Sequence, residues 1–215
     1  MASVSSPYGL KPVNLIGGQS FNGGAMREYK LSTDNTYAFA VGNVVSLSSA
    51  GNPDCINSSP SAIKIPATSS DATAGIVGTC VGVRYIDPVL KYEVFGQYLP
   101  AAAITAGYTK VFIIVCDDPD QLYQIQGSAA FGTLTNGANG AVGKNAALGN
   151  FGVNATTGKS TVNLVVGTNG GSLASTPTLA MRVVDVVSET ATDTYPDLIV
   201  KFNVGVHSYN NSLGV

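Results

Sequence analysis

Residues 110–126, KVFIIVCDDPDQLYQIQ, constrain the fold of this chain more than any other stretch. The apolar run 111–116 is typical of a strand buried on both faces. Asp117-Asp118-Pro119-Asp120 favours a turn, because proline fixes its own φ and Asp side chains bond nearby backbone amides. Residues 122–126 then begin a second strand. Two strands joined by so short a turn indicate an all-β protein.

Short strand patterns recur along the chain, separated by residues that favour turns. Gly78 and Gly82 interrupt the longest pattern and indicate a bend, a bulge or a close backbone approach. Residues 100–107, PAAAITAG, are the one plausible helical turn, with proline first and glycine last. So many short strands predict an antiparallel β-sandwich or barrel. The remaining expected strands are 28–31, 37–41, 44–47, 63–65, 75–86, 92–99, 162–166, 179–187 and 198–207.

Residues 1–24 are expected to form an extended arm ahead of a β domain spanning 25–215. The segment 6–13, SPYGLKPV, holds two prolines and a glycine, which exclude a regular helix. Extended segments with regular apolar anchors suit docking along another surface. A strand or coil packed on the chain's own domain is an equally good interpretation. If the arm docks on another protein, the candidate contacts are Tyr8, Leu10, Pro12 and Val13.

Residues 127–160 differ from the rest of the β domain in composition. They are rich in Gly, Asn and Ala and show no sustained apolar period. We therefore expect a long excursion there, of a kind that is uncommon in a compact domain unless it is functional or disordered. Short strands near Phe131 or Leu148 are the alternative.

Charge is scarce in this chain, at 11% of residues, against about 25% in ordinary soluble proteins. The net charge of −2 gives no electrostatic signature of nucleic-acid binding. Apolar runs are far shorter than the roughly 18 residues that span a bilayer, and no signal peptide is expected at the N-terminus. Either Ser, Thr and Asn keep the surface soluble, or neighbouring subunits cover much of it.

No motif in the sequence specifies catalysis or a cofactor. His207 is the sole histidine and is expected on the polar face of the last strand, exposed to solvent. Asp117, Asp118 and Asp120 could bind Ca²⁺, but a plain turn is the better interpretation because the EF-hand spacing is missing. We therefore expect no enzyme, no metal site and no cofactor. The cysteines are expected to be small buried hydrophobes in a reducing cytosol: Cys55, Cys80 and Cys116.

Several short segments carry a family resemblance over most of the chain. They are Ser6-Pro7-Tyr8-Gly9-Leu10, Pro12-Val13-Asn14-Leu15, Val41-Gly42-Asn43-Val44-Val45, Gly75-Ile76-Val77-Gly78, Asp117-Asp118-Pro119-Asp120, Val142-Gly143-Lys144-Asn145 and Thr157-Gly158-Lys159-Ser160. Together they resemble small virion proteins of tailed phages, particularly phages of cyanobacteria and other aquatic bacteria. The resemblance implies a head decoration (cement) protein, which binds the outside of the capsid lattice and often trimerises.

On this resemblance, the expected function is that of a structural virion protein that stabilises the phage head. Its expected partners are the major capsid protein and further copies of itself, with a homotrimer favoured, and neither nucleic acid nor membrane. It would be made in the host cytoplasm and located on the capsid exterior. The alternative is a tail or fibre-associated virion protein with a glycan-binding role, which ten Tyr but no Trp mildly disfavour.

Overall fold

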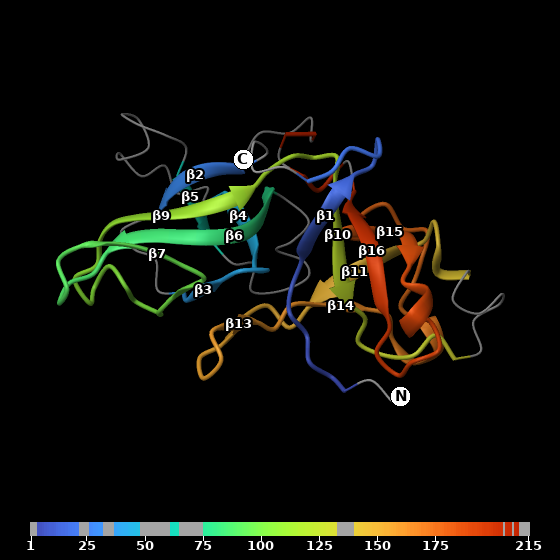
Figure 1. Cartoon of the computed structure of the whole chain (residues 1–215). Coiled ribbons are helices and arrows are strands. Elements are labelled where there is room, and N and C mark those ends of the chain that lie inside the picture. Colours follow the sequence, from blue (N-terminus) through green and yellow to red (C-terminus); the bar gives the residue numbers. More distant parts are fainter. Residues whose placement is uncertain are drawn as a thin grey trace.

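The fold is all-β, with no α-helix among the residues that the computed structural model describes. The described residues are 4–21, 26–31, 37–47, 61–64 (backbone only), 75–132, 140–203, 205–207 and 209–210. Two curled sheets lie side by side, and the N-terminal segment runs along the second of them (Figure 1). This agrees with the expected sandwich or barrel, and it divides the β domain into two lobes.

The first lobe is a small closed barrel. Its sheet follows the order β4-β5-β2-β9-β6-β7, and an additional pairing of β4 with β6 closes five of these strands into a ring. All pairs in the ring are antiparallel except β2 with β5. The strands are β2 (Met26–Leu31), β4 (Val44–Leu47), β5 (Ser61–Lys64), β6 (Ile76–Ile86), β7 (Glu93–Gly96) and β9 (Thr109–Cys116).

The second lobe is an antiparallel sheet in the order β1-β10-β16-β15-β11-β14. It curls until its last strand approaches the end of β10, where the Ser128 amide donates to the Leu164 carbonyl at 2.8 Å. We call this lobe the curled sheet. Its strands are β1 (Lys11–Leu15), β10 (Gln121–Gln126), β11 (Asn145–Gly149), β14 (Asn163–Val165), β15 (Met181–Val186) and β16 (Asp197–Phe202).

Smaller elements complete the described part of the chain. They are the pair β3 (Phe39–Ala40) and β8 (Tyr98–Leu99), the hairpin of β12 (Val153–Asn154) and β13 (Lys159–Ser160), and the 3-10 turns η5 (Thr168–Gly170) and η6 (Ser188–Thr190). The excursion expected at 127–160 therefore contains three strands, and the alternative strand near Leu148 is β11. Phe131 is buried without belonging to a strand.

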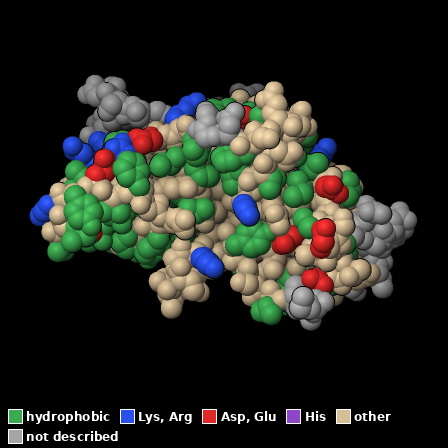
Figure 2. All heavy atoms as spheres, in the orientation of Figure 1, with side chains coloured by type: hydrophobic (Ala, Val, Ile, Leu, Met, Phe, Trp, Pro, Cys, Tyr) green, Lys and Arg blue, Asp and Glu red, His purple; other side chains and the backbone are tan. Residues whose placement is uncertain are grey.

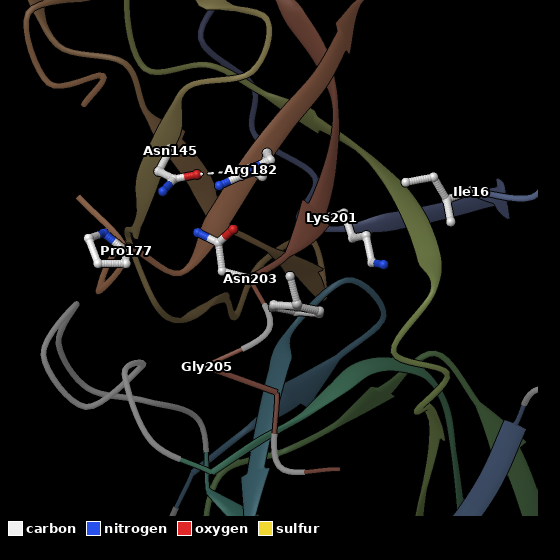
Figure 3. A pocket seen from close by; sticks show the side chains of 8 residues that line it. Ile16, Asn145, Pro177, Arg182, Lys201, Asn203 and Gly205 are labelled. Carbon is white, nitrogen blue, oxygen red and sulfur yellow. Dashed lines mark hydrogen bonds between the residues drawn. The ribbon is translucent and has the colours of Figure 1, made fainter. Parts of the chain in front are cut away.

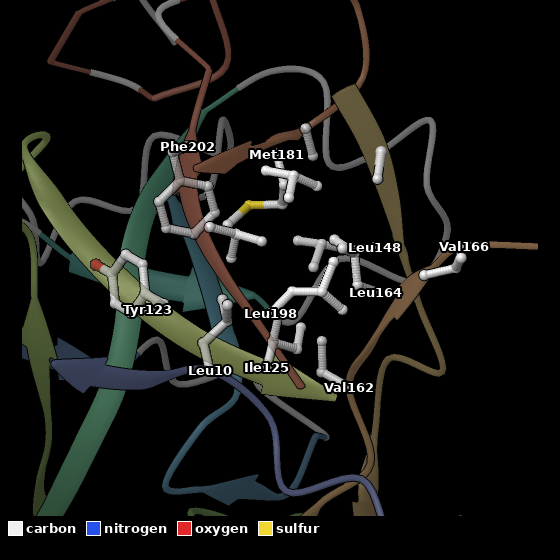
Figure 4. Close-up of a cluster of buried hydrophobic side chains, with 14 of the residues drawn as sticks. Leu10, Tyr123, Ile125, Leu148, Val162, Leu164, Val166, Met181, Leu198 and Phe202 are labelled. Atoms are coloured by element: carbon white, nitrogen blue, oxygen red, sulfur yellow. The ribbon is translucent and has the colours of Figure 1, made fainter. Parts of the chain in front are cut away.

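Each lobe has its own hydrophobic core, and Phe151 packs against both. In the curled sheet the period of two along β16 turns Leu198, Val200 and Phe202 inward, as the sequence predicts. Figure 4 shows Leu198 and Phe202 within this core. Phe202 meets the ring of Tyr123 edge-on, with 5.3 Å between the centroids. Aromatic pairs of this geometry contribute about 0.5–1.5 kcal/mol beyond their burial.

The stretch 110–126 links the two lobes. The two predicted strands exist as β9 and β10, but they pair in different sheets, so residues 117–120 form a crossing and not a hairpin. The expectation that 111–116 is buried on both faces is wrong. From Val111 to Val115 only alternate residues are fully buried, whereas Phe112 and Ile114 lie half-exposed on the outer face of the barrel. The barrel interior covers one face of this strand, where Val111, Ile113 and Val115 join the core, and the other face meets solvent.

The helical turn expected at 100–107 is replaced by a succession of turns. One helix-like bond forms, from the Ala106 amide to the Ala102 carbonyl at 3.0 Å. Ala102 itself has φ of 52°, in the left-handed region, so the helical conformation cannot extend through it. Backbone geometry at one residue thus overrides the favourable proline and glycine at the ends.

Candidate interaction surface

The most distinctive surface of the described chain is an apolar end of the barrel. Figure 2 shows hydrophobic side chains gathered at the end of the molecule where β7 lies in Figure 1. Four large apolar side chains there are mostly exposed, at 83%, 55%, 58% and 69% respectively: Val89, Leu90, Tyr92 and Phe95. We call these four residues the end surface. Contiguous exposed apolar patches are typical of sites that bind another macromolecule.

The backbone holds Val89 and Leu90 outward. Both residues lie in the connection between β6 and β7, and the Asp87 carboxylate accepts hydrogen bonds from both of their amides at 2.8 Å. A backbone hydrogen bond from the Lys91 amide to the Asp87 carbonyl, at 3.0 Å, spans this connection, and Lys91 has φ of 60°. An Asp that bonds backbone amides two and three residues ahead fixes a turn. The two apolar side chains are therefore presented by an ordered loop.

Phe95 is presented by β7, above a row of charges on the outer wall of the barrel. Its partner across the strands is Arg84. The Arg84 guanidinium bonds Glu28 at 2.5 Å and Glu93 at 2.6 Å, and it lies 4.4 Å from the centre of the Phe112 ring. The bonds to Glu28 and Glu93 raise the pKa of Arg84. The charged groups of this row are thus paired with one another, one cation between two carboxylates, while the four apolar side chains of the end surface stay exposed.

The four candidate arm residues lie against the chain's own body. Leu10 is 1% exposed and belongs to the core of the curled sheet, while Tyr8, Pro12 and Val13 are half-buried. Residues 11–15 are β1, paired with β10, and the Tyr8 hydroxyl donates to Asp197 at 2.9 Å. In this conformation the side chain of Leu10 packs in the core of its own chain. The interpretation of a strand packed on its own domain describes residues 11–15.

Three of these arm residues nevertheless share one groove. Tyr8, Leu10 and Pro12 line a hollow of about 410 Å³ together with Val41, in the turn between β3 and β4, and Gln124 of β10. Burial raises the pKa of the Tyr8 hydroxyl, and the neighbouring Asp197 carboxylate raises it further. Tyr8 therefore acts as a neutral hydrogen-bond donor that fastens the segment to the curled sheet.

The three acidic side chains of the 117–120 crossing point to different partners. Asp117 accepts a hydrogen bond from the Tyr29 hydroxyl at 2.7 Å and pairs with Arg27 at 3.1 Å. Asp118 accepts the amide of Asp120 at 2.8 Å, and Asp120 pairs with Lys201 at 2.6 Å. These contacts are those of a turn that joins two lobes. Among the described residues, no group of three or more His, Cys, Asp or Glu is arranged to hold a metal ion.

The expectation that His207 is exposed is wrong, because its side chain is fully buried. The strand β16 ends at Phe202, so the alternation of faces does not continue to His207. The ring lies 6.0 Å from that of Phe202 and 5.6 Å from that of Tyr209, beside the junction of the lobes. Burial lowers the pKa of His207 and outweighs the opposing effects of the Val77 backbone and Asp117.

The cysteines that the structure describes are unreactive. Cys80 and Cys116 are both buried and free, as expected, while Cys55 lies outside the described residues. Burial raises the pKa of the Cys80 thiol to about 12 and that of Cys116 to about 11. Because the thiolate is the nucleophile, neither side chain is suited to nucleophilic catalysis at neutral pH.

Sequence reasoning missed the end surface, although a signal was present. Val89 and Leu90 stand in a connection between two strands, flanked by Pro88 and Lys91. Connections of this kind are normally polar, since they run over the surface. An adjacent apolar pair at such a position therefore marks exposed hydrophobic side chains.

Comparisons with known proteins add no assignment to this geometry. No family model, no curated protein and no solved structure matches the chain. In the part of the chain that the structure describes, no helix has the length and apolar character needed to span a membrane.

Proposed function

We propose that this chain is a structural virion protein that decorates the outside of a phage head and stabilises the major capsid lattice. The end surface is the observation that supports this role. It offers four mostly exposed apolar side chains, two of them on a loop held by the Asp87 carboxylate. A preordered apolar surface loses little conformational freedom when it docks.

The rest of the molecule is compatible with a purely structural role. Two β lobes with separate cores form a body bridged by residues 117–120. Few charged side chains would have to be desolvated in subunit contacts, because only 11% of residues are charged. Many copies that each bind weakly can hold a lattice together through multivalency. We further propose that the protein acts as a homo-oligomer, with a trimer favoured.

The proposal leaves the N-terminal segment a smaller part than the sequence suggests. Contacts of Tyr8, Pro12 and Val13 with the capsid remain a prediction, and they would form along the outside of β1. A contact by Leu10 would require residues 4–15 to leave the curled sheet. We therefore place the main docking contact at Val89, Leu90, Tyr92 and Phe95.

The first test is the copy number of this chain in purified particles of the virus that encodes it, measured by quantitative mass spectrometry. A ratio near one to the most abundant capsid protein is expected. A few copies per particle would instead favour the tail or fibre alternative, and complete absence would overturn a virion role.

The second test uses capsids depleted of the protein and a double variant, Val89→Ser with Phe95→Ser. Rebinding is expected to weaken more than about tenfold, since buried aromatic and aliphatic anchors dominate interfaces. The unfolding free energy should change by less than about 1 kcal/mol, because both side chains are mostly exposed. The matched control is Val142→Ser on the other lobe, 43% exposed, which should rebind normally. Equal rebinding by the double variant would exclude the end surface.

A further inference from the structure

A row of polar side chains crosses three strands on the outer face of the curled sheet. Asn145 of β11 stands opposite Arg182 of β15, and Arg182 stands opposite Lys201 of β16. Directly opposed residues of paired strands point to the same face. Figure 3 shows the three side chains on neighbouring strands, with Asn203 beside Arg182.

Two cations in direct opposition are unfavourable in a sheet. Lys201 is compensated, because its amine pairs with the Asp120 carboxylate at 2.6 Å. Arg182 has no carboxylate partner among the described residues. Its Nε donates to the Asn145 side-chain oxygen at 3.1 Å, which leaves the two terminal nitrogens of the guanidinium available.

Asn145 is held rigidly, so the orientation of Arg182 is fixed in turn. Asn145 is 1% exposed, and its side-chain nitrogen donates to the Thr176 carbonyl at 2.9 Å. Its backbone forms two further bonds with Ala174, at 2.7 and 3.0 Å. The amide oxygen therefore faces Arg182 before any ligand arrives. The terminal N–H donors of Arg182 are therefore held in place in advance, and preorganised donors lower the cost of binding a ligand.

A cavity of about 340 Å³ opens beside this row, with room for a small ligand. Arg182, Lys201 and the two asparagines supply its polar lining. Asn203 is 9% exposed and fixed by a bond from its side-chain nitrogen to the Leu179 carbonyl at 2.6 Å. The apolar side chains that line the cavity are Ile16 and Pro177, because the Phe202 ring, which also borders it, is turned into the core.

We infer that this cavity binds a carboxylate group through the terminal nitrogens of Arg182, with its carbon skeleton against the apolar lining. The guanidinium fork matches a carboxylate in bidentate geometry. The formal charges of Arg182, Lys201 and Asp120 sum to +1, which a single carboxylate neutralises and a phosphate dianion exceeds. The group can come from a small carboxylic acid or from an acidic side chain of a partner protein. The inference stands independently of the proposed role in a capsid.

The test is a titration of the isolated protein with sodium propionate at constant ionic strength, with sodium chloride and inorganic phosphate as reference anions. The readout is the Nε–Hε signal of Arg182 in nuclear magnetic resonance spectra. Propionate is expected to shift this signal saturably, and chloride is not. No saturable shift with propionate, or saturation by phosphate alone, would overturn the inference.

Variants of Arg182 distinguish bidentate binding by its guanidinium from attraction to a positive charge alone. Arg182→Gln, followed through the backbone amides of Asn145 and Asn203, should weaken propionate binding at least about tenfold, since a charge-assisted bidentate pair is lost. Arg182→Lys keeps the charge but not the fork and should weaken binding at least about threefold. Lys159→Gln, at an exposed lysine that does not line the cavity, should bind propionate as the unaltered protein does. Unchanged binding by both Arg182 variants contradicts the assignment.

A second arm distinguishes the two sources of carboxylate. A blocked tripeptide, acetyl-Gly-Glu-Gly-amide, is titrated beside propionate under the same conditions. Tighter binding of the peptide indicates an acidic side chain of a protein partner, whereas tighter binding of propionate indicates a small acid. Either result supports a carboxylate site. If neither ligand shifts the Arg182 signal saturably, the inference is overturned.

Discussion

The junction between the two lobes and the far end of the barrel are built from opposite kinds of contact. At the junction, backbone meets backbone, and buried polar groups such as Asn43 and Tyr29 have specific partners. At the far end, Val89 and Phe95 face solvent without any cover. Close backbone packing and hydrogen bonds at the junction stabilise the folded chain. Exposed apolar side chains add nothing to its stability until a partner buries them. Substitutions should therefore affect folding at one place and binding at the other.

A close fit at the junction is the crossing of Gly9 and Gly42. The Leu10 amide donates to the Gly42 carbonyl at 2.9 Å, which brings the N-terminal segment against the turn between β3 and β4. Gly42 has φ of 92°, and a Cβ built there would lie 2.5 Å from the Tyr8 carbonyl oxygen. No other residue type fits without moving one of the two chain segments.

Gly42→Ala is expected to have the largest effect on stability. It adds a backbone clash to the cost of a left-handed conformation, so the free energy of unfolding in urea should fall by about 4 kcal/mol or more. The matched control is Gly143→Ala, with φ of 82° and no atom within 4 Å of the added Cβ. It should lose only about 1–2 kcal/mol. Equal losses in the two variants would show that the crossing adds nothing to the junction.

Particular glycines show how much of the fold the sequence predicts. The interruption of 75–86 by Gly78 and Gly82 predicts a close approach or a bulge, and both occur. A Cβ at Gly78 would collide with the Cys116 carbonyl, and the pairing of β6 with β9 shifts register between Cys80 and Gly82. The predicted strand 44–47 coincides with β4. Glycine spacing and apolar alternation are local signals, so they identify strands and bends reliably.

Partners in space are harder to predict, because local patterns do not specify which strands pair. The sequence predicts both strands of 110–126 but cannot show that they enter different sheets. Asn145–Gly149, NAALG, has small side chains and almost no period, so β11 is expected only as an alternative near Leu148. The row of Asn145, Arg182 and Lys201 depends on register between three distant segments. None of the three residues is singled out by its sequence neighbours.

Asn43→Ala should have the second-largest effect, because Asn43 joins the turn between β3 and β4 to the segment that carries the β12-β13 hairpin. Its side-chain oxygen accepts the Ala40 amide at 2.7 Å, and its nitrogen donates to the Gly152 carbonyl at 2.8 Å and to the Ser160 hydroxyl at 3.2 Å. Loss of the side chain leaves buried groups unsatisfied, at an expected cost of about 2–3 kcal/mol in urea unfolding. Asn154→Ala, which removes two amide bonds from an exposed turn, should cost less than about 1 kcal/mol. An equal loss of unfolding free energy in the two variants would show that the hydrogen bonds of Asn43 stabilise the protein no more than those of an exposed turn.

His207 should give the smallest effect, and one that depends on pH. Burial lowers its folded pKa below the ordinary value of 6.5, so the unfolded chain takes up the proton first. Stability is therefore fully present above pH 6.5, declines as the pH falls below that value, and stops declining once the pH is below the lowered pKa. The slope from this residue cannot exceed about 1.4 kcal/mol per pH unit.

The measurement is the free energy of unfolding between pH 7.5 and 5 for the native chain and for His207→Gln. The variant should lose less stability than the native chain over this range, whatever its stability at pH 7.5. Asp117 and Asp118 raise the pKa of His207 and Lys201 lowers it, so high salt should change the midpoint of the loss without removing it. Parallel pH profiles for the two proteins would show that protonation of His207 does not lower the free energy of unfolding. In that case the junction would tolerate charge as readily as the solvent-exposed far end of the barrel does.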